Sequence, residues 1–455
     1  MEKANASLNR FFSGPPKAIR RFLLTALAVL LLAVGTRPAA AADKAEIDAI
    51  IASIPSDWPK APSVSAKTAV LMDADSGEIL YAKDATKAMY PASTTKLMTA
   101  LLTLENCSLT DIVDFPFAAV NIPAGSSHIG MRRGEQMVLR ECLYGLLLPS
   151  ANEVANALAI HISEYIDNFV VLMNERAYQL GAVNTVFTNA NGLHDDGHYT
   201  CAYDLAVIMQ ACAHNTAFVE IASTPSYVHH ADALLDKDIP MTNTDLMIRS
   251  SSEYYNPDVV CGKTGHTEIS GYNLVSYAER DGMHLISVVM GCENGAQYTS
   301  TQSLLDYGFN YFHQVLPGEL DSSLNMNASF TSSPLALPVP EVPLLVLDEG
   351  GTILLPETIT FDLLDKRVED TEDGKLITYV YQGFPLGSVR LSGEDNGRSN
   401  PIFVQKEEEA LSISSAEPMA AFDGWLIVSL AALLLLLIAF IVMTARIVTP
   451  KKKYT

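Results

Sequence analysis

The feature that most constrains this chain is a long apolar run close to its C-terminal end. Trp425–Met443 covers 19 consecutive positions, in which Ser429 is the only clearly polar side chain. Such a run has no polar face for water and is long enough to cross a bilayer, which needs about 20 apolar residues. The tail 444–455 carries four basic residues and no acidic ones, and positive charge stays on the cytoplasmic side. We predict a transmembrane helix at 425–443, a cytoplasmic basic tail and an outward-facing main body.

A shorter apolar run near the N-terminus points to the same compartment. Phe22–Val34 follows Lys17, Arg20 and Arg21, and the small residues Ala39–Ala42 come after it. A positive region, a short apolar core and a small-residue cleavage site are typical of a secretory signal. The alternative is a retained anchor, but 13 residues are too few to span a core of about 30 Å. We predict a signal peptide at residues 1–42 and attachment to the cell membrane by a single C-terminal pass.

Charge and cysteine content narrow the possible partners. The net charge is −22, and because the two ends contribute +5 and +4, the segment between them carries −31. So acidic a surface repels phosphate backbones, which argues against nucleic-acid binding. Six cysteines in an exported chain permit disulfides, or several of them are simply small buried hydrophobic residues. No CxxC occurs, so neither a structural zinc site nor a redox pair is indicated.

Hydrophobic patterning predicts an α+β domain over residues 43–317. A β-hairpin is expected from residues 67–73 and 78–83, and a helix from 91–105. Further helical patterns cover 139–162 and parts of 165–225. Three runs at 259–264, 272–279 and 284–290, joined by short polar connections, favour an antiparallel meander. Strands at both ends with helices between them predict a helical cluster packed on an antiparallel sheet.

A different pattern begins near Pro317. After a Pro-rich stretch, short β-type runs at 344–347, 353–355, 359–364, 376–381 and 388–391 are separated by turn residues. We predict a small all-β domain over 318–404. The Glu-, Ser- and Ala-rich stretch 405–424 is predicted to be a flexible linker to the membrane helix.

Three short motifs stand in one order along the chain. Ser93 and Lys96 frame an SxxK that opens the first predicted helix; Ser150 and Asn152 frame an SxN; Lys263 opens a KTG on the first meander strand. SxxK and KTG each occur once, and only one of three SxN matches lies between them.

The i, i+3 spacing puts the serine and lysine of SxxK on one helix face. A serine hydroxyl needs a base, and a lysine that has lost its proton can serve. Burial and a second cation, which Lys263 could supply, both lower a lysine pKa.

This ordered set resembles the low-molecular-mass penicillin-binding proteins that are serine D-alanyl-D-alanine carboxypeptidases. The longer stretches 90–100, 262–267 and 270–275 are also similar to that family's signatures, as are 191–193 with 202–206, and 285–291. The resemblance covers about 60–315 well and the β-rich region loosely. It implies a penicillin-recognising, transpeptidase/β-lactamase-like α+β fold, a small C-terminal β domain and a membrane anchor.

The resemblance also implies roles for particular residues. Ser93 would be the acylated nucleophile, Lys96 its general base, Ser150 a proton relay, and Asn152 a group that orients Lys96 and the substrate amide. The KTG would bind the substrate's terminal carboxylate and line the site, and the backbone N–H groups of Ser93 and His266 would form the oxyanion hole. These assigned substrate-binding residues are Lys263, Thr264, Gly265 and His266. No metal or cofactor is required, and the His-Asp-Asp-Gly-His stretch at 194–198 is interpreted as a turn.

The implied function is removal of the terminal D-Ala from peptidoglycan pentapeptide stems through an acyl-enzyme, with β-lactam antibiotics as covalent inhibitors. Two departures from the family pattern are visible: Glu153 stands where Asp is frequent, and 293–302 contains no Lys or Arg where some members have an arginine. Two alternatives stay open. One is a class A-like β-lactamase, although no Glu-x-x-Leu-Asn string lies between Asn152 and Lys263. The other is a catalytically weak cell-wall-binding protein of the same fold.

Overall fold

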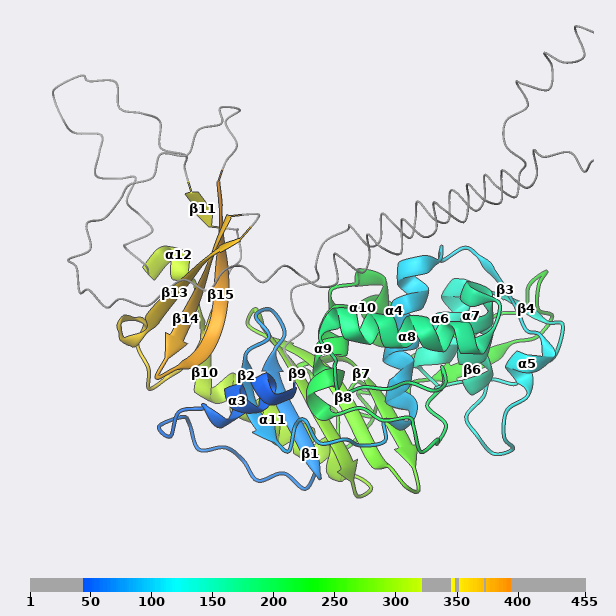
Figure 1. The fold of residues 1–455 in the computed structure, drawn as a ribbon. Helices are drawn as coiled ribbons and strands as arrows, with labels where there is room; N and C mark the ends of the chain where they lie inside the picture. The colour runs from blue at the N-terminus through cyan, green and yellow to red at the C-terminus, as the bar shows by residue number, and fades with distance from the viewer. Residues whose placement is uncertain (1–43, 321–344, 348–351, 372–373, 394–455) are drawn as a thin grey trace, which may run out of the picture. The chain divides into compact units, whose positions relative to one another are not determined.

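The structure, a computed structural model, describes residues 44–320, 345–347, 352–371 and 374–393 (Figure 1). All of them belong to one compact unit, Met1–Asn396. The predicted signal peptide, the linker 405–424 and the predicted membrane helix 425–443 lie outside the described residues. Within the described part no single helix has the length and apolar character of a membrane span. Two helices, Ala202–Ala213 and Thr216–Ala222, meet that test only as a pair bent by 105°.

A five-stranded antiparallel sheet organises the larger part of the fold. Its order is β2-β1-β9-β8-β7, and neighbouring strands are antiparallel throughout. The strands are β1 (Thr68–Asp73), β2 (Ile79–Lys83), β7 (Val259–Thr267), β8 (Gly271–Arg280) and β9 (Met283–Cys292). The predicted hairpin and the predicted meander are both confirmed. The first strand pairs with the last, with Thr68 opposite Met290, so the two ends of the region meet in one sheet.

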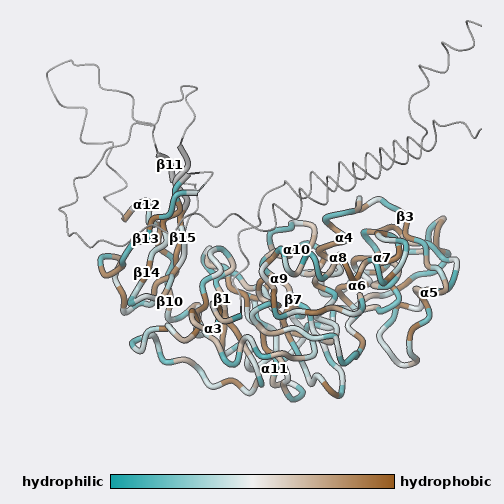
Figure 2. The backbone as a smooth tube through the Cα atoms, in the orientation of Figure 1, coloured by the Kyte–Doolittle hydropathy of each residue, from teal (hydrophilic) through white to brown (hydrophobic). Residues whose placement is uncertain are grey.

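Both faces of this sheet are buried. Side chains alternate along β1, so that Val70 and Met72 join one hydrophobic cluster while Ala69 and Leu71 join another. The first cluster contains the apolar residues of α9 (Ala202–Ala213), a largely hydrophobic helix in Figure 2. The second contains Leu304 and Leu305 of α11 (Ala296–Tyr311), which covers the opposite face. The sequence analysis predicted no element at α11.

The helical cluster carries the segments that form the site described below. A 3-10 turn, η1 (Ala92–Thr95), runs directly into α4 (Lys96–Asn106). The pattern at 139–162 forms two helices, α6 (Leu139–Leu147) and α7 (Asn152–Ser163). The break between them contains Pro149, which cannot continue the backbone ladder of α6. The SxN motif is therefore held on a short turn between two helices.

Smaller elements complete this part of the chain. They are α3 (Lys44–Ala52), β3 (Ile112–Asp114), α5 (Phe117–Val120), β4 (Gln136–Val138), α8 (Ile166–Leu180), α10 (Thr216–Ala222), β5 (Ser226–His229), β6 (Ile239–Thr242), β10 (Phe312–Val315) and α12 (Pro317–Leu320). β3 pairs with β4 and β5 with β6, each as an antiparallel ribbon.

The C-terminal described residues are largely β, as predicted. β12 (Ile353–Pro356) pairs with β10, and a second sheet has the order β11-β15-β14-β13. Its strands are β11 (Leu345–Leu347), β13 (Asp365–Thr371), β14 (Gly374–Tyr381) and β15 (Phe384–Gly393). The prediction of a strand at 359–364 is wrong: Phe361–Leu363 is a 3-10 turn, in which the N–H of Leu363 donates to Thr360 O. β13 was not predicted, because this exposed edge strand is mostly charged and lacks apolar alternation.

Candidate active site

Ser93 and Lys96, the first predicted pair, lie together where η1 becomes α4. Lys96 Nζ is 3.0 Å from Ser93 Oγ, as the i, i+3 spacing predicted. The start of this turn is tied to the sheet by Asn273 on β8. Its Nδ2 donates to Tyr90 O at 2.9 Å and to Pro91 O at 3.0 Å. The sheet therefore fixes the position from which Ser93 faces the neighbouring segments.

Lys96 is fully buried and has three partners. Besides Ser93 Oγ, its Nζ donates to Asn152 Oδ1 at 2.7 Å and to Asn191 O at 2.6 Å. Burial lowers the pKa of Lys96 well below its ordinary value, and the nearby Lys263 lowers it further. A neutral lysine amine has two N–H groups and one lone pair. The two N–H groups can donate to Asn152 Oδ1 and Asn191 O, and the lone pair can accept from the Ser93 hydroxyl.

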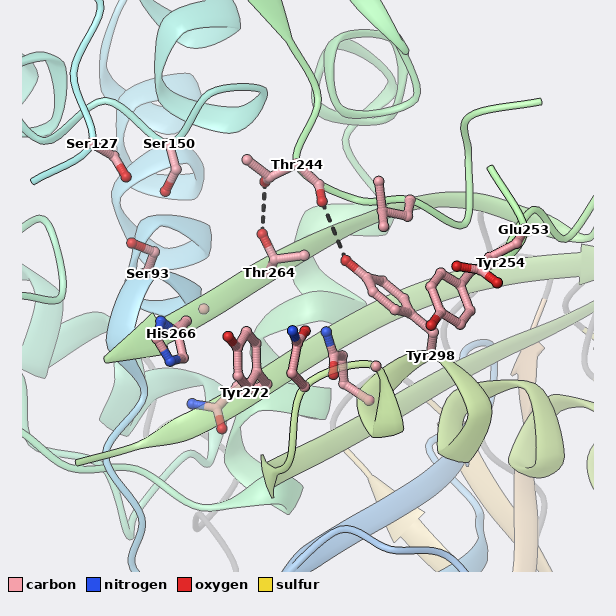
Figure 3. A pocket seen from close by; sticks show the side chains of 16 residues that line it. Ser93, Ser127, Ser150, Thr244, Glu253, Tyr254, Thr264, His266, Tyr272 and Tyr298 are labelled. Atoms are coloured by element: carbon pink, nitrogen blue, oxygen red, sulfur yellow. Dashed lines mark hydrogen bonds between the residues drawn. The ribbon is translucent and has the colours of Figure 1, made fainter. Parts of the chain in front are cut away.

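Ser150 and Asn152 approach this pair from the break between α6 and α7. Ser150 is 4% exposed and adopts a φ of 65°, which is unfavourable for any residue other than glycine. Among the described residues its Oγ has no hydrogen-bond partner. Figure 3 shows this hydroxyl facing Ser93 across the site. The SxN turn thus presents one free hydroxyl and one amide oxygen to the Ser93–Lys96 pair.

Lys263 and Thr264 come from β7. Lys263 is 1% exposed, and its Nζ donates to Thr264 O at 3.1 Å. Burial lowers the pKa of Lys263 to about 7, although the nearby Asp245 carboxylate acts in the opposite direction. Thr264 Oγ1 is 2.6 Å from Thr244 Oγ1. A buried cation and two hydroxyl groups therefore lie side by side, which suits an anionic group of a ligand.

Gly265 lets β7 approach the backbone of η1. A Cβ on Gly265 would lie 2.7 Å from Pro91 O and 3.1 Å from Ser93 N, closer than a side chain tolerates. The next residue, His266, stacks on Tyr272 with ring centroids 4.0 Å apart. Glycine is therefore needed at this position for β7 to pass so close to the backbone of η1.

A cleft of about 540 Å³ runs along this edge of β7 (Figure 3). Of the predicted site residues, Ser93, Ser150, Thr264, Gly265 and His266 line it. Lys96, Asn152 and Lys263 are not among the lining residues, because they are buried behind its wall. The other lining residues are Ser127, Thr244, Leu246, Glu253, Tyr254, Tyr272, Asn273, Asn294, Gly295, Gln297 and Tyr298.

The end of the cleft away from Ser93 is aromatic and polar. Tyr254 and Tyr298 stack with ring centroids 4.7 Å apart, and Tyr298 Oη donates to Thr244 O at 3.4 Å. None of the residues that line the cleft is an arginine. The stretch 293–302, which contains no Lys or Arg, therefore contributes a tyrosine, Tyr298, to the cleft wall. Lys263, the residue before Thr264, is buried just behind that wall.

Glu153 has a role that the sequence analysis missed. It is buried, and its Oε1 accepts hydrogen bonds from the N–H groups of Ile129 at 2.7 Å and Gly130 at 3.0 Å. These bonds hold the loop that carries Ser127 into the cleft, and Ser127 O accepts from the N–H of Asn152 at 2.9 Å. A carboxylate next to Asn152 was visible in the sequence, but the loop that it binds was not.

His198 is a second residue whose contribution could not be read from the motifs. It is 2% exposed, and burial lowers its pKa to about 4, so it is neutral near pH 7. Its Nδ1 accepts from the N–H of Thr188 at 2.9 Å, which leaves Nε2–H to donate to Thr95 Oγ1 at 2.7 Å. Thr95 in turn donates to Ala92 O at 2.8 Å. The turn at 194–198 thus supports η1 from behind.

The fold and the site together define a class of protein. An antiparallel sheet covered by helices, a Ser–Lys pair at a helix start and a KTG on the edge strand make up the α+β, penicillin-binding, transpeptidase-like fold. The crystal structure of a D-alanyl-D-alanine carboxypeptidase from Mycobacterium tuberculosis H37Rv superposes with a TM-score of 0.51 at 30% identity, covering 56% of this chain and 95% of that one. Penicillin binding protein 6B from Escherichia coli shares the fold, with a TM-score of 0.55 at 24% identity over 74% of this chain and 98% of that one.

Sequence comparison gives the family. The family model Peptidase_S11, described as D-alanyl-D-alanine carboxypeptidase, matches residues 56–294, and the chain belongs to this family. A similar relative is the D-alanyl-D-alanine carboxypeptidase DacF of Bacillus subtilis (strain 168), 34% identical over 256 residues. That match covers 54% of this chain and 63% of DacF, so the chain spans less than two thirds of that relative's length.

Proposed function

We propose that this protein is a serine-type D-alanyl-D-alanine carboxypeptidase that removes the terminal D-Ala from peptidoglycan stem peptides. The observation that carries the proposal is the set of partners around Lys96. Its Nζ lies 3.0 Å from Ser93 Oγ, and its other two partners are the carbonyl oxygens Asn152 Oδ1 and Asn191 O. This arrangement suits an amine that keeps two N–H groups and offers its lone pair to the serine hydroxyl.

In the proposed mechanism, acylation uses the groups described above. Ser93 Oγ attacks the carbonyl carbon of the scissile D-Ala–D-Ala bond while its proton passes to Lys96 Nζ. The carbonyl oxygen becomes an oxyanion and accepts hydrogen bonds from the backbone N–H groups of Ser93 and His266. Ser150 Oγ relays the proton from Lys96 to the leaving nitrogen, the C–N bond breaks and D-Ala departs. The free hydroxyl of Ser150 supports this role.

Deacylation completes the cycle without a cofactor. Water attacks the ester carbon on Ser93, its hydroxyl stays with the peptide, and its second proton returns to Ser93 Oγ through Lys96. Asn152 holds Lys96 throughout and accepts from it at 2.7 Å. A β-lactam presents an amide and a carboxylate to the same groups, so we propose that penicillins acylate Ser93.

We propose that the substrate's terminal carboxylate is bound by Lys263, Thr264 and the backbone beside Gly265. The buried ammonium of Lys263 and the Thr264 hydroxyl, 2.6 Å from that of Thr244, support this assignment. No arginine lines the cleft, so this contact carries the recognition of the carboxylate. Peptides that lack a free C-terminal carboxylate should therefore be poor substrates.

We also propose that the enzyme is exported and anchored in the cell membrane. Its segments would be a signal peptide at 1–42, a catalytic domain at 43–317, a small β domain at 318–404, a linker, and a membrane helix at 425–443. The apolar run 425–443 and the basic tail behind it support this proposal. A chain that stops at residue 424 should appear in the soluble extracytoplasmic fraction, while the full chain sediments with membranes. Equal sedimentation of both chains would contradict the membrane helix.

The test of the activity is a labelling experiment with the full chain. A fluorescent penicillin should attach to the wild type, with the adduct mapping to Ser93, and Ser93→Ala should neither label nor release D-Ala from a pentapeptide. Label on another residue would overturn the assignment. A short-lived adduct with fast antibiotic turnover would instead support the β-lactamase alternative. Peptidoglycan binding without D-Ala release would support the wall-binding one.

A further inference from the structure

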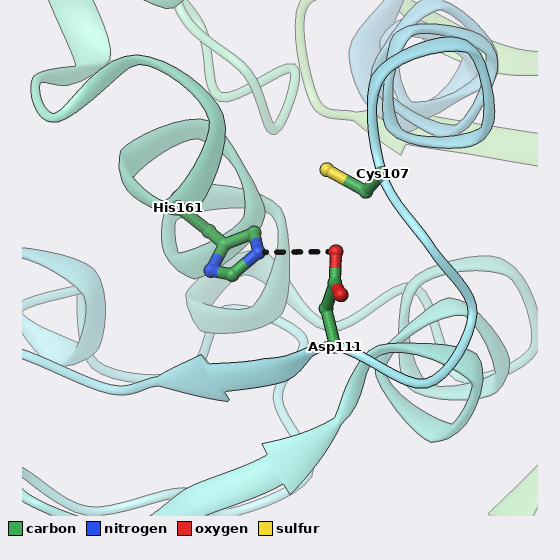
Figure 4. Close-up of side chains that lie close together, drawn as sticks. All are labelled: Cys107, Asp111 and His161. Carbon is green, nitrogen blue, oxygen red and sulfur yellow. Dashed lines mark ion pairs between the residues drawn. The ribbon is translucent and has the colours of Figure 1, made fainter.

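Three side chains of kinds that can bind a metal ion lie close together outside the cleft. Cys107, Asp111 and His161 each offer one ligand atom, and the three atoms lie within 4.8 Å of one another. Figure 4 shows the thiol, the carboxylate and the imidazole facing a common space. His161 Nε2 is 3.9 Å from Asp111 Oδ2, which is long for an ion pair. Nothing in the proposed activity uses these residues.

The helices of the active site place this cluster. Cys107 is the C-terminal cap of α4, whose first residue is Lys96, and its N–H donates to Thr103 O at 3.1 Å. His161 is in the last turn of α7, whose first residue is Asn152. At about 1.5 Å of rise per residue, the cluster lies some 15 Å along these helices from the site. Cys107 and His161 therefore lie at the C-terminal ends of the two helices whose first residues, Lys96 and Asn152, belong to the active site.

Asp111 is held in a tight turn between these helix ends. Its N–H donates to Ser108 O at 3.0 Å, and its Oδ2 accepts from the N–H of Ser108 at 2.9 Å. Its own carbonyl accepts from the N–H of Leu139 at 2.8 Å, which fixes the turn against the start of α6. The carboxylate is thus oriented by backbone bonds before any ion arrives.

The donor set and spacing suit one metal in particular. Thiolate sulfur, imidazole nitrogen and carboxylate oxygen are the ligands of zinc, with Zn–S of about 2.3 Å and Zn–N or Zn–O of about 2.0–2.1 Å. A tetrahedral site with these bonds needs ligand atoms about 3.3–3.6 Å apart. The described atoms, within 4.8 Å of one another, require closure by about 1 Å. Rotation of the exposed His161 side chain and of the half-buried Cys107 thiol toward the fixed Asp111 carboxylate can supply that movement.

We propose that Cys107, Asp111 and His161 bind a zinc ion, with water as the fourth ligand. On binding, the Cys107 thiol loses its proton to solvent and the thiolate, the neutral imidazole and the carboxylate each donate a pair to Zn²⁺. The ion would link the C-terminal ends of α4 and α7 to the turn before β3 (Ile112–Asp114). Because zinc would bind the folded chain and not its dispersed ligands, it would stabilise the fold by mass action.

The test uses the full chain in detergent, kept reduced with a non-chelating phosphine. Titration with Co²⁺, which adopts the same geometry, should give a sulfur-to-cobalt charge-transfer band that Zn²⁺ then removes. Zn²⁺ should also raise the melting temperature of the wild type. Absence of the band and of the shift would overturn the proposal.

Three variants and one control make the assignment specific. Cys107→Ser should abolish the charge-transfer band, and His161→Asn and Asp111→Asn should each weaken Co²⁺ binding by about tenfold or more. Asn at 111 can still accept from the Ser108 N–H, which keeps the turn intact. The control is His230→Asn, because His230 lies 3.6 Å from Asp238 in an exposed pair. It should bind metal as the wild type does. A band that survives in Cys107→Ser, or is lost in His230→Asn, would contradict the site.

Discussion

At the scale of single residues, the proposed mechanism gives the two buried lysines, Lys96 and Lys263, different tasks. In that mechanism Lys96 accepts a proton, whereas Lys263 holds an anion. Lys96→Arg should abolish acylation by penicillin, because a guanidinium cannot act as a base near neutral pH. Lys263→Arg should reduce acylation far less, because a cation remains. The second-order rate of acylation measures both effects, and equal losses in the two variants would contradict the assignment.

The pH dependence of acylation follows from the two lysines. The rate should rise with pH as Lys96, whose pKa is lowered by burial and by Lys263, loses its proton. It should fall again above about pH 7, where free Lys263 becomes neutral and no longer attracts a carboxylate. A bell-shaped profile is therefore expected, with its falling side set by Lys263.

Asp245 provides a way to move that falling side. Its carboxylate, fully buried with a pKa raised to about 6 by burial, raises the pKa of Lys263. Asp245→Asn should keep the hydrogen bond from the Met247 N–H, 2.9 Å in the wild type, and should shift the falling side to lower pH. Below about pH 6 the two profiles should converge, because Asp245 is then protonated in the wild type. If the falling side lies at the same pH in the variant and in the wild type, Asp245 does not influence the pKa of Lys263.

At the scale of elements, the turn between α6 and α7 is strained so that it can present Ser150. Ser150 has a φ of 65°, and a residue with a Cβ costs about 1–2 kcal/mol there. Ser150→Gly and Ser150→Ala both remove the hydroxyl, so both should lose acylation to the same extent. Ser150→Gly should nevertheless be more stable than Ser150→Ala by about 1 kcal/mol. Thermal unfolding of the two variants tests this, and equal stability would show that the turn relaxes.

The sequence predicts the elements whose burial follows a simple period. β1, β2 and the meander alternate or run apolar, and the KTG motif lies on β7, the first meander strand. The SxxK motif lies where η1 runs into α4, in the stretch whose pattern predicted a helix. α11 was missed because its buried face includes Ser300 and Thr301 as well as leucines, which weakens the helical period. Glu153, Asp245 and His198 were missed for another reason. Their partners at 129, 263 and 95 are distant in sequence, and only the fold brings them together.

At the scale of the whole molecule, a buried carboxyl group with a raised pKa lowers the free energy of unfolding as pH rises. This is opposite to the usual loss of protein stability in acid. Glu78 is 5% exposed, and burial together with the neighbouring Asp73 raises its pKa well above its ordinary value. Between the unfolded and folded pKa values the unfolded chain binds fewer protons, so the free energy of unfolding falls as pH rises. The loss is at most about 1.4 kcal/mol per pH unit for this one group.

Glu78→Gln removes that titration. The melting temperature of the variant relative to the wild type should increase as pH rises above the ordinary pKa of a glutamate, because only the wild type must ionise a buried acid. Glu175→Gln, at an exposed position of α8, is the matched control and should leave the melting temperature close to that of the wild type. A pH-independent difference for Glu78→Gln would show that Glu78 ionises without penalty.

The pairing of β1 with β9 sets the order in which this protein can fold. Thr68 lies opposite Met290 in the antiparallel register, so two central strands of the sheet come from the two ends of the region that bears the site. Loop-closure entropy opposes such a long-range contact, and topologies of this kind fold slowly. During synthesis β1 can pair with β2 early, but its other edge has no partner until β9 has been made. The five-stranded sheet therefore cannot be completed until residue 292 has been made, and a chain without its finished sheet can still be threaded through a narrow pore.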